Sequence, residues 1–275
     1  MLSALAVPRL VRFAMLGLIL PVLASAAAPE VEKAWADLDN SRPRAVFQEL
    51  DGKLTSPEAR LAWASALMSD QPATDGNMRK AEDILNDIAQ GRDDTAAEAA
   101  YLSGRINQLY YSTPDCAKAA QIYRALADRQ PQSHWAQLGL VKLGLIELYA
   151  PADPNTAPAV RVAAAEALLP RIHEPFLCRD LELQIGQAGV VLKLPLREVI
   201  PHLVAADRVG GFSASAREDL VVQIGELSLR AGEPAQAKAY FERYLREFPG
   251  MLREYVVRIR LQEANRLLQQ QTAAR

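Results

Sequence analysis

One spacing of small and aromatic residues limits what this chain can fold into. Gly225, Gly232, Ala237, Phe241 and Pro249 stand at offsets of 0, 7, 12, 16 and 24 residues. This pattern is the skeleton of a helix–turn–helix unit of about 34 residues. The small residues let two helices touch, and the proline ends the second helix. Chains built from such units usually hold other proteins, so the spacing indicates binding rather than catalysis.

The chain matches itself at similar intervals. Residues 77–89 align with residues 115–127 at seven chemically equivalent positions, all at an offset of 38. A glycine marks the first helix of four successive pairs: Gly104, Gly139, Gly186 and Gly225. These glycines are 35, 47 and 39 residues apart, and the wide gap contains the proline-rich loop 150–158, which we interpret as an insertion. A glycine within a helix costs about 1 kcal/mol relative to alanine, so we expect the paired helix to approach closely at each one.

Apolar residues recur at the helical period through almost the whole chain after residue 28. Prolines, glycines and capping residues fall between the periodic segments, where helices begin and end. The predicted helices cover residues 29–39, 42–53, 56–69, 76–90, 94–111, 114–129, 133–149, 157–173, 177–193, 196–208, 215–231, 234–248 and 251–270. We therefore expect an all-α protein of six helix pairs and a final helix. An apolar stripe on that helix is expected to close the array; its members are Leu252, Tyr255, Val256 and Ile259.

With these features the chain resembles the tetratricopeptide repeat (TPR) family and its SEL-like relatives. In the family pattern a Trp, a Leu-Gly pair and a Tyr mark the first helix, and Ala, Phe or Tyr and a final Pro mark the second. The matching residues in mid-chain are Trp135, Leu138, Gly139, Ala119, Tyr123 and Pro131. Lys142 and Ser228 stand where the family has Tyr. The resemblance implies a right-handed α-solenoid of about six helix–turn–helix (TPR-like) repeats plus a C-terminal capping helix.

The resemblance covers residues 27–270 unevenly. Residues 29–54 and 150–215 match only in their helix pattern, and residues 271–275 are expected to form a disordered tail. In the family the first helices line a concave, partner-binding face, so positions around the marker glycines are expected to contact an extended peptide or a partner helix. These positions are Tyr101, Arg105, Gln108, Leu140, Leu143, Gln187, Val190, Val222, Glu226 and Leu229. The apolar members have a second interpretation as interhelical core, because stripes at helical spacing usually mean burial.

The first residues have the pattern of an export signal. Arg9 and Arg12 form a positive start, residues 13–23 form an uncharged apolar run, and residues 24–26 give a small-x-small cleavage pattern. We expect cleavage after Ala26 and a periplasmic mature protein. The alternative is an uncleaved membrane anchor, but the apolar run is shorter than the roughly 20 residues that span a bilayer.

Composition and charge limit the classes of partner that the chain is expected to bind. The chain has 31 basic and 33 acidic residues, a net charge of −2, and no strongly basic stretch, so nucleic acid is not expected as a partner. No second apolar run is long enough to cross a membrane. Cys116 and Cys178 suit a disulfide in an oxidising compartment. The repeat register puts them at opposite rims, which favours two partly buried free thiols over a bridge.

The sequence predicts no enzyme, no cofactor and no metal site. His134, His173 and His202 have no second histidine three or four residues away, so the helical metal-binding pair is missing. Residues 211–215 resemble a nucleophile elbow but lack its last glycine and its preceding strand, so a helix-capping serine is the better interpretation. The sequence has no glycine-rich phosphate loop.

The favoured function is a periplasmic scaffold that binds another envelope protein or peptide segment in cell-envelope assembly or export. One alternative is a glycan-binding solenoid, in which Trp63, Trp135, Tyr110 and Tyr111 stack on sugars. The other is a non-canonical cell-wall hydrolase, for which the sequence offers no catalytic constellation.

Overall fold

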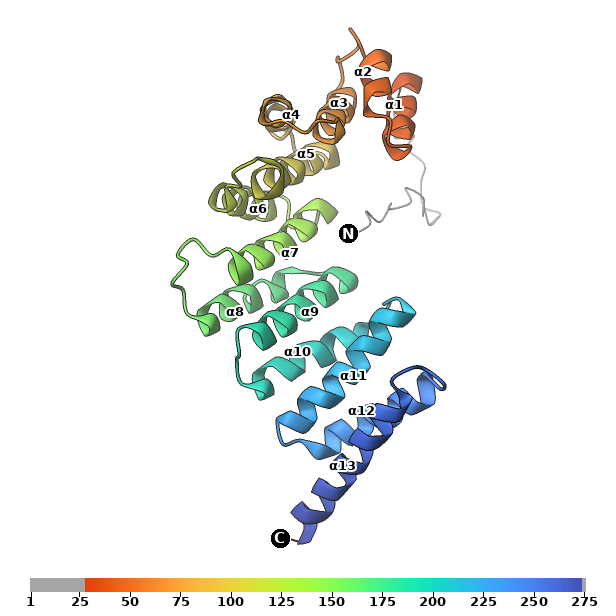
Figure 1. Cartoon of the computed structure of the whole chain (residues 1–275). Helices are drawn as coiled ribbons and strands as arrows, with labels where there is room; N and C mark the ends of the chain where they lie inside the picture. The colour runs from red at the N-terminus through yellow and green to blue at the C-terminus, as the bar shows by residue number, and fades with distance from the viewer. Residues whose placement is uncertain (1–27, 274–275) are drawn as a thin grey trace, which may run out of the picture.

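The computed structural model describes residues 28–273, and within that range the chain is entirely helical, without a β-strand. Thirteen α-helices of the described part pack one after another in an elongated, curved array (Figure 1). This architecture confirms the predicted all-α class. The expected signal peptide, residues 1–26, and positions 274–275 of the expected tail lie outside the described residues.

The helix bounds follow the sequence signals closely. The α-helices are α1 (Pro29–Asp39), α2 (Pro43–Glu49), α3 (Pro57–Ser69), α4 (Asp75–Ile88), α5 (Asp94–Arg105), α6 (Cys116–Arg129), α7 (His134–Tyr149), α8 (Pro158–Glu166), α9 (Pro175–Val191), α10 (Leu196–Val209), α11 (Ala214–Arg230), α12 (Pro234–Glu247) and α13 (Glu254–Ala273). Two short helices accompany them, the π-helix η1 (Ile106–Tyr110) and the 3₁₀-helix η2 (Leu169–Arg171).

Two local devices fix where the helices begin. Helices α1, α2, α3, α8, α9 and α12 start with a proline, whose fixed φ suits the first turn and whose missing N–H leaves no donor unpaired. Side-chain oxygens cap α3, α4, α5, α6, α7 and α11; the capping residues are Ser56, Thr74, Asp93, Asp115, Ser133 and Ser213. Ser213 accepts the backbone N–H of Ala216, which confirms a capping serine in the elbow-like segment.

The helix expected over residues 94–111 changes character near its end. It is an α-helix only to Arg105 and then continues as the π-turn η1. A π-turn inserts one extra residue into a helix. In this turn the buried Asn107 reaches the carboxylate of Glu82 on α4. Sequence periodicity gave no sign of this change.

Two other helix ends differ from the prediction. The helix expected over residues 157–173 stops at Glu166, because Pro170 has no N–H with which to continue the α-helical ladder. Residues 271–273 continue α13 instead of beginning a disordered tail. Thr272 supports this last turn by donating its hydroxyl to the carbonyl of Leu268 at 2.9 Å.

The helices form two layers, which differ in how closely their successive helices pack. In the odd-numbered layer, α1 contacts α3, α3 contacts α5, α5 contacts α7, α7 contacts α9, and α11 contacts α13. Within the described residues, no two even-numbered helices pack as closely. Figure 1 shows α4, α6 and α8 on the outer side of the curve and α5, α7 and α9 nearer its inner side. The array therefore bends around its odd-numbered layer.

Long polar side chains span the wider gaps between even-numbered helices. Three such bridges join residues 36 apart in the sequence: Glu82 with Lys118, Glu166 with His202, and Asp207 with Arg243. A fourth bridge, between Asp128 of α6 and Arg171 of the 3₁₀-helix η2 at 2.7 Å, spans 43 residues. The longer span follows from the loop 150–157, which lies between α7 and α8 as the glycine intervals predict.

Three of the four marker glycines are points of close approach to the next helix, as predicted. An added Cβ at these positions would overlap a side chain of that helix: Gly104 against Tyr123, Gly186 against Leu203, and Gly225 against Phe241. Gly139 differs, because its nearest neighbour is Tyr123 of the preceding helix, with 3.3 Å to the Cδ1 atom. Tyr123 thus occupies the space that two glycines leave open.

The last helix does not close the array in the way that the sequence predicts. The side chains of the expected stripe are solvent-exposed, with exposed fractions of 100% for Leu252, 74% for Tyr255, 51% for Val256 and 44% for Ile259. Val257 and Ala264, on the opposite side of α13, pack against the core around Phe241 and Tyr244. The face of α13 that docks therefore carries Val257, Ala264 and the partly buried Leu261, and the predicted stripe lies outside.

We predict that Gly225→Ala destabilises the fold. A Cβ at this position would lie 2.6 Å from Cε1 of the buried Phe241, and overpacking of this kind costs about 1–3 kcal/mol. Gly76→Ala is the matched control, because its Cβ would meet only the Thr74 hydroxyl at 3.7 Å; it should stabilise by about 0.4–1 kcal/mol. Urea denaturation measures both. Equal effects of the two substitutions would contradict the close approach.

Neighbouring valines of α13 test which face of the helix is docked. Val257 is 1% exposed and Val256 is 51% exposed. Val257→Ala should lower the free energy of unfolding by about 2 kcal/mol, and Val256→Ala should change it by less than about 0.5 kcal/mol. Thermal or urea denaturation separates them. A larger loss of stability for Val256→Ala than for Val257→Ala would support the predicted capping stripe instead.

Candidate functional site

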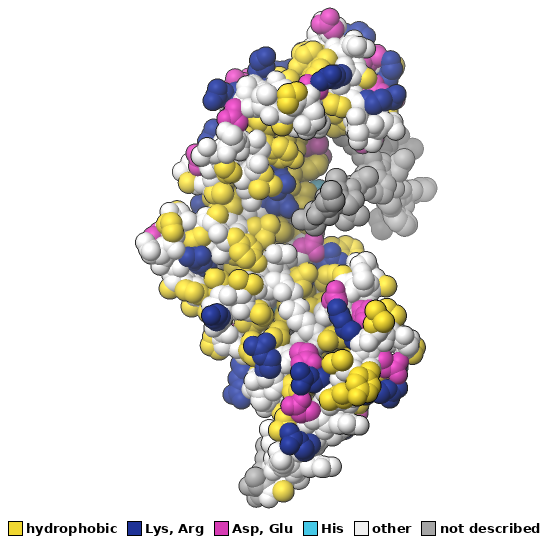
Figure 2. Space-filling view, in the orientation of Figure 1, with side chains coloured by type: hydrophobic (Ala, Val, Ile, Leu, Met, Phe, Trp, Pro, Cys, Tyr) yellow, Lys and Arg dark blue, Asp and Glu magenta, His cyan; other side chains and the backbone are white. Residues whose placement is uncertain are grey.

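The odd-numbered layer carries the residues that the sequence nominates for partner contact. Seven of the ten are half-buried, so their side chains reach solvent from within the layer: Tyr101, Arg105, Gln187, Val190, Val222, Glu226 and Leu229. The other three are buried, and they are Gln108, Leu140 and Leu143. Leu140 and Leu143 are each 1% exposed in the core around α7, so they pack the array and do not face a partner. Figure 2 shows hydrophobic side chains over much of the middle of one face, with charged side chains among them.

Arg105 of α5 lies at the edge of an aromatic cluster. Its Nη1 donates a long hydrogen bond of 3.4 Å to Oε1 of Gln108, and the Tyr123 hydroxyl donates to the same oxygen at 3.0 Å. The Tyr101 ring centroid lies 6.1 Å from that of Tyr123 and 5.5 Å from that of Trp135. Within the described residues, Arg105 has no carboxylate partner.

Lys142 of α7 belongs to this site although sequence reasoning did not nominate it. Its side chain is half-buried, and no hydrogen bond or ion pair engages its ammonium group among the described residues. Burial lowers the pKa of Lys142, and the charge of Arg105 lowers it further. The negative charge of Asp180 on α9 raises it in part. Its only sequence signal is its position, where the TPR pattern has tyrosine.

The polar residues in the α9–α11 part of the layer have partners within the fold. Gln187 and Gln223 exchange hydrogen bonds of 2.8 and 3.1 Å between their side-chain amides. Glu226 accepts from Nε of Arg260 at 2.9 Å, so this predicted contact residue already has a partner on α13. The structure thus divides the nominated residues into two groups, one on α5 and α7 and one on α9 and α11. In the first group, Arg105 has no carboxylate partner among the described residues.

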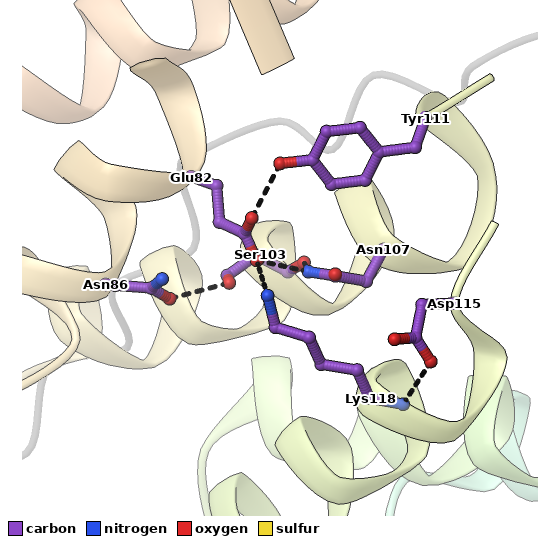
Figure 3. Close-up of polar contacts among 7 residues, drawn as sticks. All are labelled: Glu82, Asn86, Ser103, Asn107, Tyr111, Asp115 and Lys118. Atoms are coloured by element: carbon purple, nitrogen blue, oxygen red, sulfur yellow. Dashed lines mark hydrogen bonds and ion pairs between the residues drawn. The ribbon is translucent and has the colours of Figure 1, made fainter. Parts of the chain in front are cut away.

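Glu82 of α4 is the centre of a buried polar network (Figure 3). Its carboxylate accepts from Asn107, from the Tyr111 hydroxyl at 2.6 Å and from the Lys118 ammonium at 2.7 Å. Burial alone raises the pKa of Glu82, but these three donors outweigh it and hold the pKa below its ordinary value. Ser103 donates beside it to Asn86 at 2.8 Å. A carboxylate saturated in this way fixes the π-turn η1 against α4 and α6 and is unsuited to proton transfer.

His202 of α10 lies between two carboxylates. Nδ1 is 2.6 Å from Oε2 of Glu182 and Nε2 is 2.9 Å from Oε1 of Glu166. Ionised carboxylates only accept hydrogen bonds, so both contacts require the doubly protonated imidazolium. Burial lowers the pKa of His202, but the hydrogen bonds and charges of the two glutamates outweigh it and raise the pKa above its ordinary value.

Other places in the described residues offer little chemistry. No group of three or more His, Cys, Asp or Glu side chains there is arranged to hold a metal ion. A cavity of about 240 Å³ beside His202 is lined by apolar residues that include Val162 and Ile185 and by the acidic Glu166 and Glu198. Cys116 and Cys178 are free, half-buried thiols against one core cluster, which confirms the favoured interpretation over a disulfide. Among residues 28–273 no helix combines the length and apolar character needed to cross a membrane.

Comparisons with known proteins do not assign this chain to a family. No protein-family model matches the chain, and no curated protein matches it either. The candidate site therefore rests on the arrangement of Arg105, Lys142 and the aromatic cluster in the odd-numbered layer.

The His202 bridge predicts a specific dependence of stability on pH. Because its pKa is raised on folding, the bridge contributes fully below about pH 6.5 and its contribution is lost as the pH rises through the folded-state value. The stability difference between the wild type and His202→Gln should therefore be largest in mild acid and smallest near pH 9.

Urea denaturation across this pH range measures the difference. The exposed His173 supplies the control, since His173→Gln removes a histidine outside any such bridge. A His202→Gln difference that grows with rising pH would contradict the assignment.

Proposed function

We propose that this chain is a scaffold that binds another protein along its odd-numbered helix layer. The observation that carries the proposal is the direct packing of odd-numbered helices from α1 to α9 and of α11 with α13, in a layer that holds half-buried side chains of α5, α9 and α11. Curved helical arrays of this kind present extended surfaces to elongated partners. An extended peptide or a partner helix suits such a surface.

We further propose that the array is a right-handed, TPR-like solenoid of six helix pairs plus α13. The polar bridges that recur at 36 residues support this division, because each joins the second helices of two consecutive pairs. The glycine contacts of α5, α9 and α11 support it as well, since each receives the following helix at the same register.

The proposed setting is the periplasm. The support is the export pattern of residues 1–26, with cleavage after Ala26. The proposed partner is accordingly another envelope protein, engaged during envelope assembly or export.

The two alternative functions have less support. Trp63 packs against Phe47 with ring centroids 4.9 Å apart, and Trp135 packs against Tyr101, so both half-buried tryptophans take part in packing between helices. The most enclosed carboxylate network, around Glu82, is saturated with donors and gives a hydrolase no general acid. Binding to a protein remains the best-supported role.

Site-specific photo-crosslinking in the native cell tests the binding layer. A photoreactive amino acid at Gln187 or Leu229, both in the odd-numbered layer, should give adducts with a discrete partner protein. The matched controls are Gln121 of α6 and Glu242 of α12, which are exposed on even-numbered helices. Adducts from the controls alone, or none at any position, would overturn the proposal.

A further inference from the structure

The array ends in an apolar surface. Helix α13 packs on α11 and α12 and lies at one end of the described array (Figure 1). The stripe of α13, which consists of Leu252, Tyr255, Val256 and Ile259, is exposed there, and Met251 is exposed beside it. Terminal units of helical arrays need a polar outer face for solubility. This end of the array therefore has an apolar face where a cap would be polar.

Most charges around the stripe are balanced within one copy of the chain. Residues 251–273 contain four arginines and two glutamates. The ion pairs, two of which involve carboxylates of α11, are Arg253 with Asp219, Arg258 with Glu254, and Arg260 with both Glu226 and Glu263. Arg266 and the exposed Arg246 of α12 have no ion-pair partner among the described residues. The face therefore offers a partner apolar contact, with only a small positive charge at its margins.

The other end of the described array has no apolar surface to match the stripe. Among residues 28–108 no large hydrophobic side chain is exposed, so α1 and α2 offer the stripe no such patch. The remaining exposed large hydrophobics lie in the middle of the array, between Leu109 and Val209. A head-to-tail contact joins two different patches, whereas a two-fold contact joins one patch to its own copy. The stripe of a second copy is therefore the matching surface that this chain supplies.

The spacing of the stripe suits a two-fold axis near Tyr255 and Val256. When two copies of α13 lie antiparallel about this axis, Leu252 of one copy faces Ile259 of the other. Tyr255 of one copy likewise faces Val256 of the other, so each member of the stripe meets an apolar side chain. Glu263 follows Ile259 on the same side of the helix about one turn later, and this charge limits the contact to the first half of α13.

This contact covers enough surface for a weak, specific dimer. The exposed fractions within the stripe run from 44% for Ile259 to 100% for Leu252. Covering the stripe and Met251 on both copies removes about 1,200 Å² from water, which is the lower end of the range for stable interfaces. We therefore expect a dissociation constant in the range of about 1–100 µM.

We propose that the mature chain forms a two-fold dimer in which the stripes of two α13 helices pack against each other. The proposal goes beyond the scaffold function and does not rest on it, because the only partner is a second copy. The contact supplies the neighbour that each terminal helix lacks. A two-fold contact is closed, so the assembly stops at two copies.

Sedimentation velocity of residues 27–275 at about 1–100 µM tests the dimer. The wild type should show a monomer–dimer equilibrium without larger species, and it should not weaken at high salt, because the contact is apolar. A monomer at every concentration would overturn the proposal and leave the stripe to a different protein. Growth beyond two copies, or dissociation at high salt, would overturn the two-fold apolar contact.

Charges placed in the stripe should break the dimer. Leu252→Glu/Tyr255→Glu should weaken dimerisation by about tenfold or more, because it buries carboxylates in an apolar contact. Val160→Glu/Val191→Glu is the matched control, since it adds the same charge at positions of α8 and α9 that are 58% and 70% exposed. It should change dimerisation by less than about twofold. Equal weakening in the two variants, with unchanged circular dichroism, would contradict the assigned face.

An introduced thiol tests the position of the axis without disturbing the charge. A thiol close to a two-fold axis meets its own copy within the Cα–Cα distance of about 7 Å that a disulfide allows. Mild oxidation should therefore convert Val256→Cys into a covalent dimer much faster than Val191→Cys, the exposed control on α9. Peptide mapping should find the bond between the two introduced thiols, since the native Cys116 and Cys178 are common to both variants. Equal rates for the two variants would overturn the two-fold packing of α13.

Discussion

The fold depends on polar side chains that reach from one helix pair to the next. A helix pair in such an array cannot bury its own apolar face and needs a neighbour on each side. The odd-numbered helices from α1 to α9 meet this need by direct contact, and the amides of Gln187 and Gln223 join α9 to α11. The even-numbered helices stand further apart, and pairs such as Glu82 with Lys118 and Asp207 with Arg243 close the distance between them. Bending around the odd-numbered layer follows from this difference.

The same constraint explains where the array is irregular. Helix α8 has 9 residues, and the loop 150–157 precedes it. The bridge across this place, Asp128 with Arg171, is also the most exposed of the four, with 69% and 40% of the side chains open to solvent. Surface ion pairs contribute about 0–1 kcal/mol, so the joint between α6 and η2 is held more by the core around Leu181 than by its bridge.

Much of the fold could be predicted from the sequence, because its signals are local. Prolines, capping oxygens and helical periodicity defined nearly every helix, and the repeated glycines identified three real close contacts. The π-turn at Ile106–Tyr110 could not be predicted, because it depends on the long-range partner Glu82. Lys142 was missed for the same reason, since its environment is made by α5 and α9. The stripe of α13 was misjudged because periodicity identifies an apolar face without saying which face docks.

The bridges between even-numbered helices also set how far the array can curl. Tighter curling would pull the outer helices apart and lengthen each bridge beyond hydrogen-bonding distance, so each bridge opposes such curling by the small free energy of an ion pair. Lys118 and Arg243 belong to residue types that keep their charge far above neutral pH, whereas His202 gives up its proton as the pH rises. The joint between α8 and α10 is therefore the one of these three whose stiffness follows the acidity of the surroundings.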